Sequence, residues 1–214
     1  MGIVVTRRWL IGGTAAALAA LAGPTLSRAA LVPTPRQSQG PFYPDTLPLD
    51  TDNDLIRVAG VEARARGTIT HVYGLITDLD GRALPEVQVE IWQCDANGRY
   101  RHSRDRGGQP QDPGFQGYGR TVTDEQGRYR FRTIRPVPYP GRAPHIHFAV
   151  HPARGRPLVT QMYVAGDPLN DRDLLLNSIA DATQRQHLLV ALQDDATQPG
   201  ELRGRFDIVL PAIA

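Results

Sequence analysis

Cysteine and methionine are nearly absent from this chain of 214 residues, which contains one Cys and two Met. A single cysteine excludes an intrachain disulfide, so the fold must rest on a hydrophobic core, and the chain is long enough to bury one. The same scarcity argues against a copper(I) site, because that soft ion prefers Cys and Met ligands.

An excess of positive charge is also missing once the N-terminus is set aside. The whole chain has 24 Lys and Arg against 22 Asp and Glu. Residues 1–29 contain Arg7, Arg8 and Arg28 and no acidic residue, so the remainder holds 21 basic and 22 acidic residues. A nearly neutral domain gives no reason to expect nucleic-acid binding.

The N-terminus lacks an apolar run strong enough to span a membrane. Arg7-Arg8 precedes an uncharged stretch, residues 11–26, that several Gly and Pro residues interrupt before small residues typical of a signal-peptidase site. This pattern resembles a twin-arginine signal. We expect residues 1–29 to direct export of the folded chain to the periplasm, with no stable membrane insertion after cleavage. A retained anchor is the alternative.

Short strands between Gly- and Pro-rich turns make up most of the remaining pattern. Residues alternate in polarity around 69–74 and 87–91, and a hairpin is expected to turn at 124–127. Such strands predict an all-β fold, an antiparallel β-sandwich with long loops and one or two short helices, in one domain over residues 30–214. One helix is expected at about 181–194, and the long loop at 101–120 is of a kind that is commonly functional.

Two histidines, His145 and His147, stand at positions i and i+2 in a segment expected to be a strand. Their imidazoles therefore leave the same face, with Ile146, Phe148 and Val150 on the opposite one, facing the core. This geometry suits a metal. A His-x-His pair also occurs in strands that bind none, so the pair alone leaves both possibilities open.

Two tyrosines in turn-rich surroundings, Tyr100 and Tyr139, are candidates to complete the set. A phenol has a pKa of about 10, so each phenolate costs roughly 4 kcal/mol to form at neutral pH, and only a hard, highly charged cation offsets that twice. Zinc usually takes Cys, His or carboxylate. A set of two His and two Tyr points to iron(III), although tyrosines beside prolines often serve only in packing.

Several separated motifs, in the same order, resemble the intradiol ring-cleavage dioxygenases, the family of protocatechuate and catechol dioxygenases. The likeness extends over nearly the whole chain after residue 33. The matching residues lie within the segments 34–44, 90–102, 112–121, 123–134, 139–148, 160–169 and 205–210, in several of which only some positions match.

The resemblance implies that Tyr100, Tyr139, His145 and His147 hold one non-haem Fe(3+) per chain. It also implies a catalytic role for Tyr139, which leaves the metal when a catechol binds and takes up a substrate proton. The second catalytic residue implied is Arg142, which lies beside the substrate ring and stabilises negative charge there, as a permanently charged planar group can.

Substrate contacts are implied at five positions: Gly40, Phe42, Tyr43, Arg142 and Gln161. The reaction implied is cleavage of a catechol-type ring between its two hydroxyl-bearing carbons, with insertion of both atoms of O2 to give a muconate-type dicarboxylate. The partners expected are thus a small aromatic diol and O2, with a homo-oligomer possible in a chain that carries the whole set. The preferred diol is not specified.

Two departures from the family pattern concern the substrate pocket. Only Pro140-Gly141 separates Tyr139 from Arg142, a short link without the tryptophan that often follows this tyrosine, and a long helical N-terminal domain is lacking. The alternative function, from a different class, is an exported β-sandwich binding module without catalysis, since a fold alone does not choose between binding and catalysis. Convergence of the tyrosines on the histidines separates the two.

Overall fold

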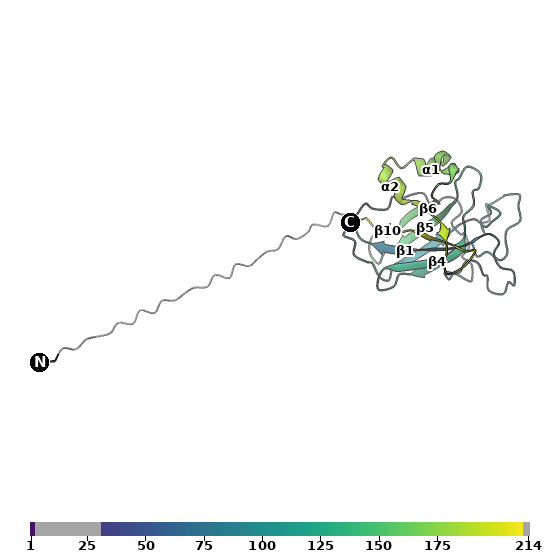
Figure 1. Ribbon diagram of the computed structural model, residues 1–214. Coiled ribbons are helices and arrows are strands. Elements are labelled where there is room, and N and C mark those ends of the chain that lie inside the picture. Colours follow the sequence, from purple (N-terminus) through teal and green to yellow (C-terminus); the bar gives the residue numbers. More distant parts are fainter. Residues whose placement is uncertain (3–30, 212–214) are drawn as a thin grey trace.

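Two β-sheets form the framework of the computed structural model, which describes residues 1–2 and 31–211 (Figure 1). The predicted leader, residues 1–29, therefore lies outside the described residues except at its first two positions. In the first sheet the order is β10-β1-β9-β8, and β4 also pairs with β1. Its strands are β1 (Ile69–Thr77), β4 (Arg128–Ile134), β8 (Gln193–Asp194), β9 (Leu202–Arg205) and β10 (Ile208–Val209).

The second sheet has the order β3-β2-β5-β6-β7. It consists of β2 (Gln88–Trp92), β3 (Tyr118–Val122), β5 (His145–His151), β6 (Leu158–Val164) and β7 (Leu189–Val190). Strand β5 lies between β2 and β6, so its backbone is paired on both sides. A doubly paired strand is a rigid support for side chains on either face.

The main core consists of the alternate side chains that the two sheets turn toward each other. Val72 and Phe131 come from the first sheet, and Ile146, Phe148 and Val150 come from β5, all at most 1 % exposed. These are the β5 residues that the alternation predicts for the core side. Arg128 and Arg130 of β4 are exposed on the opposite face of their strand, as the pattern also predicts.

The predicted sandwich is confirmed, with two differences in connectivity. Strand β1 pairs with β9 and β10 in parallel, as β6 does with β7, while the other pairings are antiparallel. The turn at residues 124–127 is present, but β3 and β4 on either side of it belong to different sheets, so the predicted hairpin is wrong. The turn instead carries the chain from one layer to the other.

Three short helical segments lie between β6 and β7: η1 (Pro168–Arg172), α1 (Leu174–Asn177) and α2 (Ala182–His187). Figure 1 shows α1 and α2 on the same side of the sandwich. None of the helices in the described residues is long and apolar enough to cross a membrane.

The predicted helix at 181–194 is wrong in its second half. Asp181 accepts a hydrogen bond from the Gln184 amide and begins α2, but the helix ends at His187. Leu189 then pairs with Tyr163 of β6, and β8 pairs with β9. Pairing with existing sheet edges satisfies backbone groups of residues 189–194, and it overrides the leucine spacing.

The outer face of β5 and β6 is covered by an N-terminal stretch, residues 34–44, that we call the covering segment. The Gln37 amide donates to the Val159 carbonyl at 2.9 Å, and the Gln161 side-chain amide donates to the Ser38 carbonyl at 2.9 Å. The two histidines of β5 consequently lie beneath the backbone of the covering segment, on the side of the sheet away from the main core. This layer contains the candidate site.

Strand β1 crosses the backbone after β9 closely enough to require a glycine. A Cβ at Gly74 would overlap the carbonyl group of Phe206. We therefore expect Gly74→Ala to lower the free energy of unfolding by about 3 kcal/mol, measured by urea denaturation. The matched control is Gly108→Ala, where a Cβ meets nothing within 4 Å; a change of about 0.5 kcal/mol or less is expected there. Equal effects would contradict the close-approach argument.

Candidate metal centre

The two histidines of β5 lie side by side beneath the covering segment, with their ring planes at 76°. Their Nε2 atoms are 3.1 Å apart, and both side chains are 1 % exposed. The Nδ1 atom of His145 lies 2.6 Å from the Ala143 carbonyl, so this nitrogen carries the proton and donates. The Nε2 lone pair of His145 is consequently directed at His147, where a shared ligand would lie.

Both imidazoles are neutral at physiological pH. Burial, assisted by the nearby charge of Arg142, lowers the pKa of His145 to about 4. Burial and the neighbouring His145 place the pKa of His147 well below its usual range. A neutral imidazole is the form that binds a metal, so neither histidine has to lose a proton first.

Apart from its contact with His145, His147 is held by packing. Trp92 of β2 stacks on its ring at 4.8 Å with an interplanar angle of 7°. On another side, a Cβ at Gly40 would lie 3.3 Å from His147 Cε1. The Nδ1 atom of His147 is buried and has no hydrogen-bond partner among the described residues. The covering segment needs a glycine here for its close approach to the ring, and its φ of +72° also favours glycine.

The two tyrosines reach the histidines from separate loops. Tyr100 follows a turn after β2, and Tyr139 lies in the connection from β4 to β5. Their ring centroids are 5.5 Å apart. The Tyr139 ring lies 5.4 Å from that of His145, and the Tyr100 ring lies 6.2 Å from that of His147. All four predicted ligand residues are thus neighbours, although 47 positions separate the first from the last.

Both phenols lie where burial opposes ionisation, so a nearby cation is needed to form either phenolate. Burial raises the pKa of Tyr100 well above its ordinary value, and its buried hydroxyl has no hydrogen-bond partner among the described residues. Burial also raises the pKa of Tyr139, against the opposing effect of Arg142. A buried polar group without a partner costs about 1–3 kcal/mol, and a hard cation at the four rings would remove that cost.

The donor set fits ferric iron better than a softer or carboxylate-bound metal. Among the described residues, no group of three His, Cys, Asp or Glu side chains could hold a metal ion. The donors nearest the two histidines are instead the phenol oxygens of Tyr100 and Tyr139. Two phenolates and two neutral imidazoles suit a hard trivalent ion.

Arg142 extends along the edge of the candidate centre. Its Nη1 atom donates to the Tyr139 hydroxyl at 3.3 Å, and Nη2 donates to the Gln161 side-chain oxygen and to the Tyr163 hydroxyl. Nε donates to the buried carboxylate of Asp173 at 2.9 Å. Arg142 and Gln161, both predicted as substrate contacts, are therefore in direct contact with each other.

Three residues around the centre were not predicted from the sequence: Trp92, Tyr163 and Asp173. The local pattern identifies Asp173 only as a possible N-cap, because it precedes Leu174-Leu175-Leu176. Its contact with Arg142, 31 positions earlier, depends on how the α1 loop folds back over β6. No local sequence pattern predicts this contact.

The covering segment brings two of its predicted substrate contacts to the centre. Gly40 lies against His147, and Phe42 stacks on Tyr100 at 4.9 Å and meets Tyr139 edge-on at 6.2 Å.

Tyr43, the third predicted contact in this segment, turns toward β2. Its hydroxyl donates to Glu90 at 3.0 Å, and its ring packs edge-on against Trp92 at 5.0 Å. Burial, with the charge of Glu90, raises the pKa of Tyr43 to about 12. Tyr43 therefore contacts the centre only indirectly, through Trp92, which stacks on His147. A direct contact between Tyr43 and the substrate stays a prediction.

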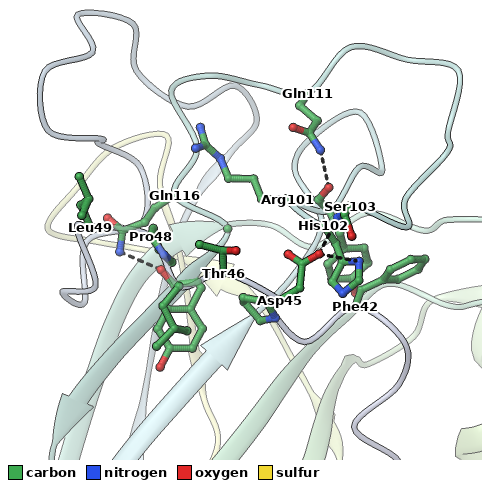
Figure 2. A pocket seen from close by; sticks show the side chains of 15 residues that line it. Phe42, Asp45, Thr46, Pro48, Leu49, Arg101, His102, Ser103, Gln111 and Gln116 are labelled. Carbon is green, nitrogen blue, oxygen red and sulfur yellow. Dashed lines mark hydrogen bonds and ion pairs between the residues drawn. The ribbon is translucent and has the colours of Figure 1, made fainter.

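A cavity of about 550 Å³ opens beside the centre, with Phe42 and Tyr100 in its wall (Figure 2). Most of its lining comes from residues 44–49, 101–103 and 116–118. Figure 2 shows Asp45 pointing toward His102 and Ser103, and the Ser103 amide donates to Asp45 at 3.1 Å. Of the four predicted ligand residues, only Tyr100 lines this space, so the cavity borders one side of the candidate centre.

The neutral buried histidines predict how the metal-free protein responds to acid. In the unfolded chain a histidine takes up a proton near pH 6.5, whereas His145 and His147 resist it when folded. The unfolded state thus binds more protons below pH 6.5, and stability falls as the pH falls. We expect the free energy of unfolding to drop by about 2 kcal/mol per histidine between pH 7 and pH 5.

Urea denaturation of chelator-treated protein at several pH values measures this effect. In a control variant carrying His145→Asn and His147→Asn, the pH dependence over the same interval is expected to flatten. An equally steep slope in the variant and in the wild-type chain would assign the acid sensitivity to other groups.

Several known proteins resemble this chain in sequence. A family model described as "Dioxygenase" matches residues 38–212. The protocatechuate 3,4-dioxygenase beta chain of Burkholderia cepacia is 39 % identical over 199 residues, covering 88 % of this chain and 83 % of the relative. Hydroxyquinol 1,2-dioxygenase of Corynebacterium glutamicum is 34 % identical over 148 residues, covering 60 % and 45 %, so this chain spans about half the length of that relative.

Solved structures give the same result. Catechol 1,2-dioxygenase from Acinetobacter sp. ADP1 superposes with a TM-score of 0.66 at 28 % identity, over 85 % of this chain and 63 % of that one. The dioxygenase domain of a carbohydrate-binding fusion protein from Streptomyces sp. SirexAA-E gives 0.64 at 28 % identity, over 86 % and 100 %. With a family match across most of its length and a relative of similar size, the chain belongs to the intradiol ring-cleavage dioxygenases and is an enzyme rather than a binding module.

Proposed function

We propose that the protein cleaves a catechol-type ring between its two hydroxyl-bearing carbons, using one iron(III) held by Tyr100, Tyr139, His145 and His147. The observation that supports this most directly is the meeting of two neutral imidazoles and two phenols in one buried layer. A packed core would not leave the hydroxyl of Tyr100 without a partner among the described residues.

Ferric iron, when bound, would supply Lewis acidity and a template on which the catechol is oriented as a dianion. Both atoms of O2 enter the product, a muconate-type dicarboxylate, so the reaction needs no external reductant. The charges of two phenolates and one hydroxide would balance the trivalent ion. The ion pair of Arg142 and Asp173 beside the four rings adds no net charge to the site.

Of the two phenols that would hold the iron, Tyr139 is the better placed to receive a substrate proton. It is partly exposed, whereas Tyr100 is 2 % exposed. It also stands on a tight turn, in which the Arg142 amide donates to the Tyr139 carbonyl and the exposed Gly141 has a φ of +82°. A short surface turn can move with little repacking.

Arg142 then stabilises negative charge on the ring. Its Nη1 donates to the Tyr139 oxygen, so a substrate that displaces Tyr139 would meet this nitrogen. Gln161 and Phe42 would border the ring on other sides, because one binds Arg142 and the other stacks on Tyr100. The relatives act on protocatechuate, catechol or hydroxyquinol by name, and we propose a diol of that class.

Purified protein is expected to be red-brown from phenolate-to-iron charge transfer, to contain one iron per chain and to consume O2 with a substituted catechol. A panel of catechols, with oxygen uptake and product identification, measures this.

We expect His147→Ala to lose iron and colour, whereas the matched variant His187→Ala, on the exposed helix α2, should keep both. A wild-type chain that stays colourless after ferric loading would overturn the proposal.

We further propose that residues 1–29 direct export through the twin-arginine pathway and that residues 30–214 act as a single domain, alone or as a homo-oligomer. The support is the Arg7-Arg8 pair ahead of an uncharged stretch, together with a metal-bound cargo that has to fold before transport. A C-terminal reporter fusion is expected to reach the periplasm only in cells with an intact twin-arginine pathway. Export that persists without the pathway, or with Arg7→Lys and Arg8→Lys, would contradict this assignment.

A further inference from the structure

The guanidinium of Arg142 is fixed on three sides before any substrate arrives. Nε donates to Asp173 Oδ2 at 2.9 Å, and Nη2 donates to the Tyr163 hydroxyl at 3.1 Å and to Gln161. Tyr163 in turn donates its proton to Gln161 at 3.0 Å. Only Nη1, which is directed at Tyr139, is left to face the candidate metal centre.

Asp173 uses both carboxylate oxygens, and each accepts two hydrogen bonds. Oδ2 accepts from Arg142 Nε and from the Ala143 amide, both at 2.9 Å. Oδ1 accepts from the amides of Leu175 and Leu176 at the start of α1, both at 3.0 Å. The side chain is fully buried, so each of these four donors depends on it.

We infer that Asp173 and Tyr163 are positioning residues for the reaction, which hold the Arg142 guanidinium so that Nη1 faces the reacting ring. This inference rests on the proposed function. A free arginine side chain has many rotamers, and fixing one of them before reaction removes that entropy from the barrier. The Asp173 carboxylate that binds Arg142 also accepts hydrogen bonds from the first amides of α1. The helical loop after β6 therefore sets the orientation of the Arg142 side chain.

A carboxylate is required at this position, because all four neighbours are donors. An amide at position 173 would offer one oxygen and one NH2 group, and its NH2 would face either the α1 amides or the Arg142 and Ala143 donors. No orientation satisfies both pairs. Burial opposes ionisation of Asp173, yet the Leu176 and Ala143 amides and Arg142 hold its pKa below the usual value, so the carboxylate is charged at neutral pH.

The test compares Asp173→Asn and Tyr163→Phe in the iron-loaded full chain. We expect kcat for catechol cleavage to fall on the order of 10²-fold in D173N and about threefold to tenfold in Y163F. Iron per chain and the charge-transfer band should stay at the wild-type level in both. Asp181→Asn is the matched control, because Asp181 caps the exposed helix α2 and makes no contact with Arg142; its kcat should be unchanged.

A double-mutant cycle with Arg142→Ala separates positioning from a general structural effect. If Asp173 acts through Arg142, adding D173N to R142A should slow the single-turnover rate by less than about twofold. An unchanged kcat in both D173N and Y163F would overturn the inference, and so would an undiminished D173N effect in the R142A background. Should D173N fail to fold with iron, an unchanged kcat in Y163F alone overturns it.

Failure of the proposed function gives a different result. In that case the wild-type chain itself would lack iron, the charge-transfer band or the ring-cleavage product, and both proposals would be overturned. A wild-type chain that binds iron and cleaves catechol, alongside D173N and Y163F variants of wild-type kcat, would overturn only the positioning role.

Discussion

The exclusion of water from the outer face of β5 is the constraint on which the rest of the site depends. Two imidazoles whose Nε2 atoms lie 3.1 Å apart stay neutral there, and the Tyr100 hydroxyl beside them has no partner in the described part of the chain. Buried groups of this kind are normally paired. A trivalent cation would satisfy all of them at once, which is why the site suits a metal and not a packed apolar layer.

The architecture achieves this by adding a third layer to a two-sheet sandwich. The inner faces of the sheets form an ordinary hydrophobic core, whereas the outer face of β2, β5 and β6 has a second cluster around Trp92, Cys94, Tyr100 and Tyr118. The covering segment and the loops after β2 and β4 close over that cluster. Rigid strands therefore carry the histidines, while loops carry the tyrosines, so that one phenol can be buried and the other partly exposed.

The same layering explains why charged residues near the centre occur as a neutral pair. Arg142 would be unfavourable beside a cation unless an opposite charge lay close to it, and Asp173 provides that charge at 2.9 Å. Because the carboxylate also caps α1, a helix of one turn with little stability of its own becomes part of the site. On our proposal, the loop after β6 thus contributes to the reaction by holding Arg142.

Much of the site could be predicted from the sequence, but only some of its contacts. The i, i+2 spacing alone places His145 and His147 on one face, because side chains of any strand alternate. Alternation likewise gives Ile146, Phe148 and Val150 to the core. The hairpin at 124–127 and the long helix at 181–194 were wrong for one reason: a local pattern does not state which sheet edge is free to accept a strand.

By itself, then, the sequence determined the sandwich, the histidine face of β5 and, through its ordered motifs, the family. Tertiary structure alone decided that Tyr43 turns to Glu90 and Trp92, that Asp173 reaches Arg142, and that the 550 Å³ cavity borders the centre at Tyr100. The physical reason is that these contacts join loops distant along the chain. Their geometry depends on how the layers pack over one another. The periodicity within one segment does not predict that packing.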